Sequence, residues 1–327
     1  MDAVKAVSAA NPLVSVVVPV YGNAAELREL HARLGGAARA IAPLECEFVF
    51  VDDGSSDQSL EVLETLAAED PRVRVLALSR NFGSNAAILA GLGQAAGDAV
   101  MTLAADLQDP PELLSELAQA WRNGGQVVLA ARRKRDDPFP GNLLAAAFNR
   151  LFRLLVFPQF PKRGFDLVLL DRAVVDTILA MPEKNSYLFG QVLWVGFRRT
   201  TLHYDRVARR SGMSGWTLWR KVKYFIDAFT AFSYLPVRVA SLLGLLLAGL
   251  GFAYAALIVV LRLRGTIVEP RGFSALLVAV LVTAGAQLVV AGLTGEYVWR
   301  VLEEVRPRPP YIVARRINAP ARQARNA

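Results

Sequence analysis

Three side chains that carry oxygen lie close together in one turn of the sequence: Asp106, Gln108 and Asp109. The turn follows the apolar run 99–103, which is typical of the end of a buried strand, and Pro111 after it is tolerated in the first turn of a helix. Hard cations such as Mg²⁺ or Mn²⁺ prefer oxygen ligands, usually one or two carboxylates together with substrate phosphates. The turn therefore predicts a metal–diphosphate site. The alternative is an acidic loop in which Asp109 caps the next helix.

Polar residues and a glycine directly follow two other apolar runs, 46–51 and 73–78; these residues are Asp52, Asp53, Gly54, Arg80 and Asn81. The two aspartates can accept hydrogen bonds from a base N–H or from ribose hydroxyls, and the glycine allows close approach of the backbone. The arginine and the asparagine could hold a phosphate. The alternative for the first cluster is a set of helix caps, because serines and an aspartate follow at 55–57.

The elements that position these side chains alternate regularly along the first 131 residues. Apolar, β-branched runs predict strands at 14–20, 46–51, 73–78, 99–103 and 127–131. Amphipathic segments between them predict helices, including 24–40 and 111–122. Alternating strands and helices favour a doubly wound, mostly parallel α/β sheet, in which the polar turns share the carboxyl edge where open α/β sheets bind ligands.

Composition excludes several classes of site. The single cysteine, Cys46, excludes an internal disulfide and a cysteine-built zinc site, and two distant histidines, His31 and His203, argue against a histidine-built one. Neither G-x-G-x-x-G after the first strand nor G-x-x-x-x-G-K-[ST] is present, which disfavours a dinucleotide fold and a P-loop. Nucleic acid is not expected as a partner, because no zinc-finger spacing, RNP-type aromatic motif or basic zipper occurs.

Hydrophobic residues make up 54% of the 327 residues, and the excess gathers near the C-terminus. Residues 239–261 and 273–295 form two runs of 23 residues without a charged side chain. Each run would be about 34 Å long as a helix, against a hydrocarbon core of about 30 Å. The sequence therefore predicts a C-terminal two-helix transmembrane hairpin.

Basic residues concentrate after residue 130, and the net charge is +8. The linker between the two apolar runs holds three arginines and the tail from Arg300 onward holds seven. The positive-inside rule therefore places both termini and the N-terminal domain in the cytoplasm, at the inner (cytoplasmic) membrane. Segments 143–157 and 216–234 are predicted to be interfacial amphipathic helices that contact membrane lipid.

Seven stretches together resemble the family 2 glycosyltransferases, most closely the polyprenyl-phosphate glycosyltransferase subgroup. They are VVVPVYGN, FVDDGSSD, LSRNFGSNAAILAGL, ADLQDPPEL, GFDLVLLDR, LFGQVLWVGFRR and GEYVWRVLEEVRPRPPY, in this order along nearly the whole chain. The resemblance implies the GT-A fold and inverting transfer of a hexose from a nucleotide-diphosphate sugar to polyprenyl (undecaprenyl) phosphate, with Mg²⁺ or Mn²⁺. A UDP-sugar is the preferred donor, and GDP-mannose and the oligomeric state are left open.

The resemblance also implies roles for single residues. Those matching nucleotide-sugar-binding positions are Pro19, Tyr21, Asp52, Asp53, Gly54, Arg80, Asn81 and Asp106. Asp106 and Gln108 match metal and diphosphate positions, and Asp166 matches an acidic residue near the reacting centre, so Asp166 and Asp106 are the catalytic candidates. Arg132, Arg209 and Ser214 match positions that bind the acceptor or a phosphate.

The residue patterns and the resemblance together divide the chain into four parts: a nucleotide-sugar-binding half at 1–135, an acceptor half with the interfacial helices at 136–235, the transmembrane hairpin at 236–300, and a basic cytoplasmic tail at 301–327. Three positions depart from the family pattern. Ala104 replaces the first aspartate of an Asp-x-Asp motif, Gly22-Asn23 replaces Asn-Glu, and Gly215 replaces a lysine. Two alternatives are kept: a processive polysaccharide synthase, which resembles this family in its catalytic half, and a membrane-tethered binding or scaffold protein whose catalysis was lost with Ala104.

Overall fold

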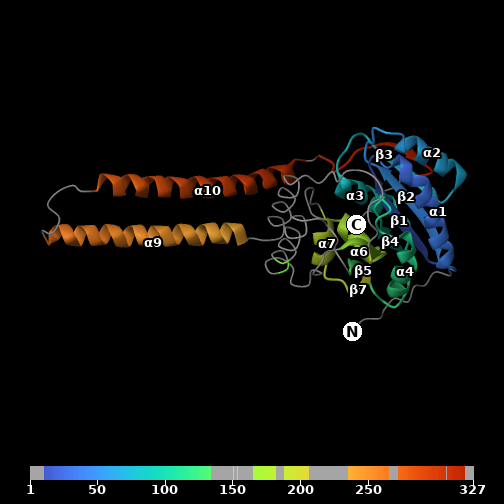
Figure 1. Ribbon diagram of the computed structural model, residues 1–327, viewed down its shortest axis with the longest axis horizontal. Helices are drawn as coiled ribbons and strands as arrows, with labels where there is room; N and C mark the ends of the chain where they lie inside the picture. Colours follow the sequence, from blue (N-terminus) through green and yellow to red (C-terminus); the bar gives the residue numbers. More distant parts are fainter. Residues whose placement is uncertain are drawn as a thin grey trace. The chain divides into compact units, whose positions relative to one another are not determined.

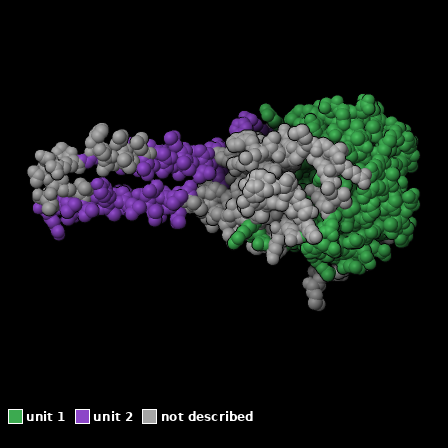
Figure 2. All heavy atoms as spheres, viewed as in Figure 1, with its two compact units in different colours: residues 1–228, 308–327 green, residues 229–307 purple. Residues whose placement is uncertain are grey.

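The computed structural model describes residues 11–133, 150, 153, 165–181, 188–205, 235–264, 272–306 and 308–320. The chain divides into two compact units, residues 1–228 with 308–327, and residues 229–307 (Figure 2). The first unit contains an eight-stranded sheet, and the second contains the long helices α9 and α10 (Figure 1).

The sheet has the strand order β7-β5-β6-β4-β1-β2-β3-β8. The strands are β1 Leu13–Val20, β2 Glu45–Asp52, β3 Val73–Leu78, β4 Ala99–Thr102, β5 Val127–Arg132, β6 Phe165–Asp171, β7 Arg199–Tyr204 and β8 Val313–Ile317. Strands β3, β2, β1 and β4 run parallel, as do β5 and β7, whereas β6 and β8 are antiparallel to their neighbours. The predicted doubly wound and mostly parallel sheet is therefore confirmed.

Helices cover both faces of the sheet (Figure 1). They are α1 Ala24–Ala40, α2 Ser59–Glu69, α3 Ser84–Gln94, the 3₁₀ turn η1 Pro111–Leu113, α4 Leu114–Arg122, α6 Arg172–Leu179 and α7 Leu188–Trp194. Helix α1 packs beside α2 and α4 on one face, and α3 packs beside α6 on the other. Leu27, Leu30 and Leu34 of α1, spaced by three and four residues, are fully buried against the sheet.

The structure differs from the sequence expectation at three elements. The helix predicted at 111–122 begins as the 3₁₀ turn η1 and becomes α-helical only at Leu114. Strands β7 and β8 were not anticipated. Strand β8 lies in the segment predicted as a basic tail, and it pairs with β3 so that Val75 lies opposite Ile317. Residues 308–320 therefore complete the sheet of the first unit.

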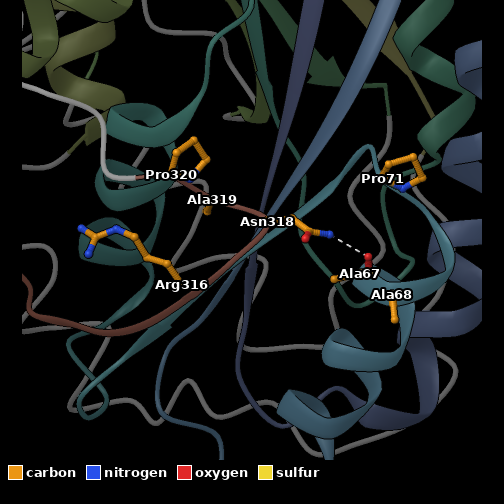
Figure 3. Close-up of a pocket in the computed structure, with 7 residues that line it drawn as sticks. All are labelled: Ala67, Ala68, Pro71, Arg316, Asn318, Ala319 and Pro320. Atoms are coloured by element: carbon orange, nitrogen blue, oxygen red, sulfur yellow. Dashed lines mark hydrogen bonds between the residues drawn. The ribbon is translucent and has the colours of Figure 1, made fainter.

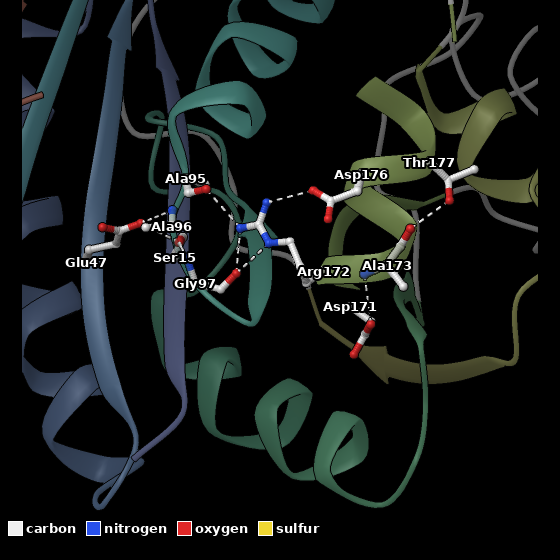
Figure 4. Close-up of polar contacts among 10 residues, drawn as sticks. All are labelled: Ser15, Glu47, Ala95, Ala96, Gly97, Asp171, Arg172, Ala173, Asp176 and Thr177. Carbon is white, nitrogen blue, oxygen red and sulfur yellow. Dashed lines mark hydrogen bonds and ion pairs between the residues drawn. The ribbon is translucent and has the colours of Figure 1, made fainter. Parts of the chain in front are cut away.

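A buried polar cluster fixes the amino end of the sheet (Figure 4). The Glu47 Oε1 atom accepts hydrogen bonds from Ser15 Oγ at 2.5 Å and from the backbone N–H of Ala96 at 2.6 Å, while Oε2 lies 2.8 Å from Arg74 Nη1. Arg172 donates to the carbonyl oxygens of Ala95 and Gly97 from the other side of this turn. Buried polar groups are stable only when paired in this way, so the cluster holds the turn that leads into β4.

A second polar cluster joins α1 to the turn before β3. Asp70 Oδ2 lies 2.9 Å from His31 Nε2 and accepts from Arg72 Nη2 at 2.8 Å, while Oδ1 accepts from Arg72 Nε at 3.0 Å. The Arg72 guanidinium holds the pKa of the Asp70 carboxyl well below its usual range. Arg72 also lies over the Phe48 ring, 5.1 Å from its centroid, which ties the cluster to β2.

We expect Asp70→Asn to lower the melting temperature at pH 7, because hydrogen bonds to a charged group contribute about 1.5–3 kcal/mol. A carboxyl with a lowered folded-state pKa contributes its full stabilisation well above its unfolded pKa, about 3.9, and loses it progressively as the pH falls from there through the folded-state pKa. The difference in melting temperature between wild type and mutant should therefore shrink between pH 6 and pH 3. Circular dichroism melts of the full chain in detergent measure it, and two parallel pH profiles would contradict the prediction.

The second unit contains α9 Leu235–Leu263 and α10 Phe273–Val305, which pack against each other. Large apolar side chains on both helices are exposed, including Leu245, Phe252 and Leu288. Within the described residues, no helix combines the length and the apolar character that crossing a membrane requires. The predicted interfacial helices at 143–157 and 216–234 lie outside the described residues, apart from Arg150 and Arg153.

Candidate active site

Four of the residues predicted to be functional lie along one edge of the sheet in the first unit. Asp52 ends β2 and Arg132 ends β5, while the turn after β4 carries Asp106. Asp166 lies near the start of β6, and because β6 is antiparallel to β4 and β5, that start lies at their carboxyl ends. The topology thus brings residues from four strands to the edge where open α/β sheets bind ligands.

Asp106 and Gln108 lie in the turn after β4, and both are partly exposed. The backbone N–H of Gln108 donates to Asp106 Oδ1 at 3.2 Å, which fixes the carboxylate beside the amide residue. Among the described residues, no three His, Cys, Asp or Glu side chains gather as a metal-binding group. One carboxylate and one amide fit a cation that takes its remaining ligands from phosphate oxygens and water, as Mg²⁺ commonly does.

Asp109 does not cap the next helix, which was the alternative role considered from the sequence. It is 1% exposed, and the residue that caps η1 is Pro110, without a side-chain hydrogen bond. Instead, Asp109 Oδ1 accepts a short hydrogen bond from the hydroxyl of Tyr204, at the end of β7. Sequence reasoning did not single out Tyr204, and no motif around it would have done so.

Asp53 holds the neighbouring loop rather than pointing freely into the site. Its Oδ1 atom accepts from the N–H of Phe82 at 2.7 Å and its Oδ2 atom from the N–H of Gly83 at 2.8 Å. Burial raises the pKa of the Asp53 carboxyl, and the two N–H groups oppose that effect. Asp53 therefore shapes the β3–α3 loop, and any contact with a nucleoside would be additional to this role.

Asp52 is as deeply buried as Asp53, with 2% of its surface exposed. Both of its carboxylate oxygens lie 3.3 Å from the backbone N–H of Ser55, which donates to them. Burial raises the pKa of the Asp52 carboxyl, and hydrogen bonds from Ser55 oppose the shift. Asp52 therefore holds the β2–α2 turn, and any contact with a nucleoside would be additional to this role.

Gly54 brings the two loops into contact. Its φ is +68°, and a Cβ atom added there would lie 2.6 Å from the carbonyl carbon of Arg80 and 2.8 Å from the backbone nitrogen of Asn81. Only glycine permits both this backbone conformation and this close approach. Arg80 stacks on the Phe82 ring at 4.0 Å and donates to the Asn81 carbonyl oxygen at 3.0 Å, so its guanidinium is held on its own loop.

The β1–α1 turn is held by side chains from the β2–α2 turn. Ser55 Oγ accepts from the N–H of Gly22, and Asp57 Oδ2 accepts from the N–H of Ala24. Asp57 Oδ1 also accepts from the N–H of Ser59, the first residue of α2, but the N-cap position is occupied by Gln58 without a side-chain hydrogen bond, so the predicted helix cap at 55–57 is wrong. Tyr21, in the same turn, is 55% exposed, and its ring is open to contact with a ligand.

The acceptor candidates are only partly described. Arg132 ends β5, is 9% exposed and lies opposite Tyr204 of β7. Asp166 falls where the β5–β6 register shifts, because Ala130 pairs with Leu167 and Ala131 with Phe165. Such irregularities in strand pairing are frequent beside active sites. Pro19 lies on β1 opposite Val51, whereas Arg209 and Ser214 lie outside the described residues.

A pocket of about 780 Å³ lies away from this edge, between the end of α2 and the end of β8 (Figure 3). Ala67, Pro71, Arg316 and Asn318 are among its lining residues. Asn318 Nδ2 donates to the carbonyl oxygen of Ala67 at 2.7 Å across it. Because Pro71 precedes β3, the pocket lies at the amino end of that strand and is not part of the candidate active site.

Comparisons with known proteins cover the same residues. The family model described as "Glycosyl transferase family 2" matches residues 15–178, which include Asp52, Asp106 and Asp166. The chain is 39% identical over 300 residues to "Uncharacterized glycosyltransferase YkcC" of Bacillus subtilis (strain 168), covering 91% of this chain and 92% of that protein. It is 36% identical over 307 residues to "SfII prophage-derived bactoprenol glucosyl transferase" of Shigella flexneri, covering 92% and 97%.

Among solved structures, the chain is similar to a mannosyltransferase of Pyrobaculum calidifontis in complex with GDP-Man and Mn²⁺. The identity is 18% and the TM-score is 0.45, with 91% of this chain and 88% of that chain covered.

Proposed function

The chain belongs to glycosyltransferase family 2, and from that premise we propose that it transfers a hexose from a nucleotide-diphosphate sugar to polyprenyl phosphate. The family and the sheet described above confirm the GT-A fold and an enzymatic role. A relative that is 36% identical over most of both chains is named a bactoprenol glucosyl transferase, which supports a lipid carrier as acceptor. A UDP-hexose is the preferred donor.

The observation that carries the proposal is the arrangement of the carboxyl edge. The loops that contain Asp52, Gly54 and Arg80 contact one another, and the turn with Asp106 and Gln108 follows β4, which pairs with β1 on the far side from β2. A nucleoside at the first loops would extend its diphosphate toward the second turn. Such an order of sites along one edge suits a nucleotide-diphosphate sugar better than a single small substrate.

The reaction needs little proton transfer. A polyprenyl phosphate is a phosphate monoester with a second pKa of about 6, so it is mostly dianionic at pH 7. One of its oxygens attacks the anomeric carbon, the bond from that carbon to the donor diphosphate breaks, and the nucleoside diphosphate leaves with the electron pair. The protein contributes in-line positioning and neutralisation of charge. Asp166 is proposed to orient the reacting groups, and Arg132 to hold the anionic acceptor.

Asp106 and Gln108 are the residues proposed to hold Mg²⁺ or Mn²⁺. A bound cation would stabilise the charge that develops on the departing diphosphate. Because Ala104 supplies no carboxylate and Asp109 is buried, Asp106 is the one carboxylate of this turn that is exposed enough to reach a cation. The site is therefore expected to form fully only when the donor diphosphate is present.

We place the reaction at the cytoplasmic face of the inner membrane. Support comes from the two uncharged 23-residue runs, which fall in α9 and α10, and from the apolar side chains exposed on these helices. A hairpin inserted in the bilayer would tether the enzyme to the membrane that contains a lipid-linked acceptor. The arginines after Arg300 favour a cytoplasmic tail.

Radiolabel transfer tests the proposal. The full chain is incubated with undecaprenyl phosphate and a panel of UDP- and GDP-sugars, with Mn²⁺, Mg²⁺ or EDTA, and washed membranes and the soluble fraction are assayed separately. We expect metal-dependent label in the lipid phase, from a UDP-hexose, with activity in the membranes. Activity confined to the soluble fraction would contradict the membrane placement. Folded protein that transfers no sugar from any donor would overturn the function.

A further inference from the structure

The turn after β4 alternates between buried and presented side chains. Ala105, Leu107 and Asp109 are 3%, 7% and 1% exposed, whereas Asp106 and Gln108 between them are partly exposed. The three buried residues act as anchors for the turn. The direction in which the two presented side chains point is therefore set by how firmly those anchors are held.

One of the anchors has an unfavourable backbone conformation. Leu107 has a φ of +56°, in the left-handed region that costs a residue with a side chain about 1–2 kcal/mol. Such a conformation persists only where the surroundings enforce it, and it is frequent at ligand-binding sites. Packing of the Leu107 side chain in the main hydrophobic core supplies part of that enforcement.

Asp109 supplies the other part through Tyr204. The Tyr204 hydroxyl donates a short hydrogen bond to Asp109 Oδ1, and both side chains are almost fully buried. Tyr204 is itself fixed, because it lies opposite Arg132 in the β5–β7 pairing and its carbonyl oxygen accepts from the N–H of Arg133 at 2.8 Å. The bond thus connects a well-held strand end to the turn that presents Asp106 and Gln108.

We propose that Tyr204 is a positioning residue, which acts through Asp109 to hold Asp106 and Gln108 in the orientation that binds the metal–diphosphate group. This inference rests on the proposed function. Removing the hydroxyl frees the turn to relax from the strained Leu107 conformation. The affinity for the diphosphate with its cation should then fall. The affinity for the nucleoside should not, because the loops proposed to bind it follow β2 and β3, on the other side of β1 from β4.

Calorimetric titration of the full chain in detergent with UDP, in Mn²⁺ and in EDTA, tests this role without using turnover. In Tyr204→Phe, we expect the affinity for UDP in Mn²⁺ to fall about 5–10-fold, the magnitude of one net hydrogen bond of about 1–1.4 kcal/mol. The affinity in EDTA should stay within about twofold of wild type. Asp109→Asn keeps an oxygen that accepts from Tyr204, so its affinity in Mn²⁺ should remain within about threefold of wild type.

Ser15→Ala is the matched control, because it removes another hydroxyl bonded to a buried carboxylate, at the amino end of the sheet. It should lower the melting temperature while leaving the UDP affinity in Mn²⁺ unchanged.

Unchanged UDP affinity in folded Tyr204→Phe, or an equal loss of affinity in Mn²⁺ and EDTA, would overturn the positioning role. A tenfold loss in Asp109→Asn would overturn it in favour of direct ligation by Asp109. Wild type that binds neither UDP nor, in a parallel titration, GDP would instead overturn the proposed function.

Discussion

Asp106→Asn is expected to lower the rate of sugar transfer at least about 100-fold, the usual cost of removing one preorganised electrostatic group from an active site. Asp106 is the carboxylate of the turn that is exposed enough to reach a ligand, because Asp109 is buried against Tyr204. The substitution keeps the size of the side chain and an oxygen that can accept the Gln108 N–H. Activity should therefore fall without a matching loss of stability, as label transfer and melting temperature will show.

Asp205→Asn is a suitable control for general loss of negative charge. Asp205 is exposed, follows directly after β7, and lies 3.8 Å from Arg133. Surface ion pairs of this kind contribute at most about 1 kcal/mol, so transfer should stay within about twofold of wild type. Transfer that persists in Asp106→Asn and in EDTA would remove the proposed metal role of Asp106. The missing carboxylate at position 104 would then be consistent with transfer that needs no metal.

Much of the sheet could be predicted from the sequence because its central strands are buried on both faces. Such strands consist of continuous apolar runs, and β3 and α1 begin and end as the sequence predicts. The amphipathic spacing of Leu27, Leu30 and Leu34 likewise specified the buried face of α1. The shared edge of the polar turns followed from the parallel arrangement alone, since each turn comes at the carboxyl end of a strand.

The outer strands could not be predicted, because their residues carry a weaker signal. Strand β7 has the partly exposed sequence RTTLHY, and β8 has two arginines at its centre. From its sequence, an edge strand with charged side chains is easily taken for a loop or a tail. Such charges nevertheless have a role in edge strands, because they protect the sheet from pairing with other chains. The strands β3 and β8 are also far apart in the sequence, because all residues of the second unit lie between them. No local sequence pattern can therefore predict that they pair.

The same limit applied within the candidate site. Residue type indicated that Asp53 and Asp109 belong to the site, but it could not indicate what their oxygens contact. Asp53 is bonded to the N–H groups of Phe82 and Gly83, and Asp109 to Tyr204. Both partners come from other loops or strands, so their roles depend on tertiary contacts. Sequence reasoning therefore proposed the residues of the candidate site but could not separate those whose side chains are exposed to a ligand from those that hold the loops.

Gly54→Ala tests the part of the site that holds the donor nucleoside. An added Cβ would lie 2.6–2.9 Å from backbone atoms of Arg80 and Asn81, and backbone atoms cannot move aside as a flexible side chain can. The substitution also places alanine at a φ of +68°. We expect a loss of stability of about 2–4 kcal/mol, the sum of a left-handed alanine and an overpacked contact. The added Cβ should push the β2–α2 and β3–α3 loops apart, so that at least one contact with the nucleoside is lost. A contact of about 1.4 kcal/mol corresponds to a tenfold change, so the affinity for UDP in EDTA should fall at least about tenfold.

Gly196→Ala separates the effect of a left-handed alanine from the effect of the steric clash between the two loops. Gly196 has a φ of +75°, but the nearest atom to an added Cβ is the carbonyl oxygen of Trp194 at 4.0 Å, so this variant has the backbone penalty without the clash. It should lose only about 1–2 kcal/mol and bind UDP as wild type does. If Gly54→Ala lost no more stability than Gly196→Ala and kept its affinity for UDP, the loops would not need their close contact. The nucleoside site would then have to be sought away from Asp52 and Arg80. A larger loss of both stability and UDP affinity in Gly54→Ala than in Gly196→Ala would instead show that the close contact between the two loops is needed for donor binding.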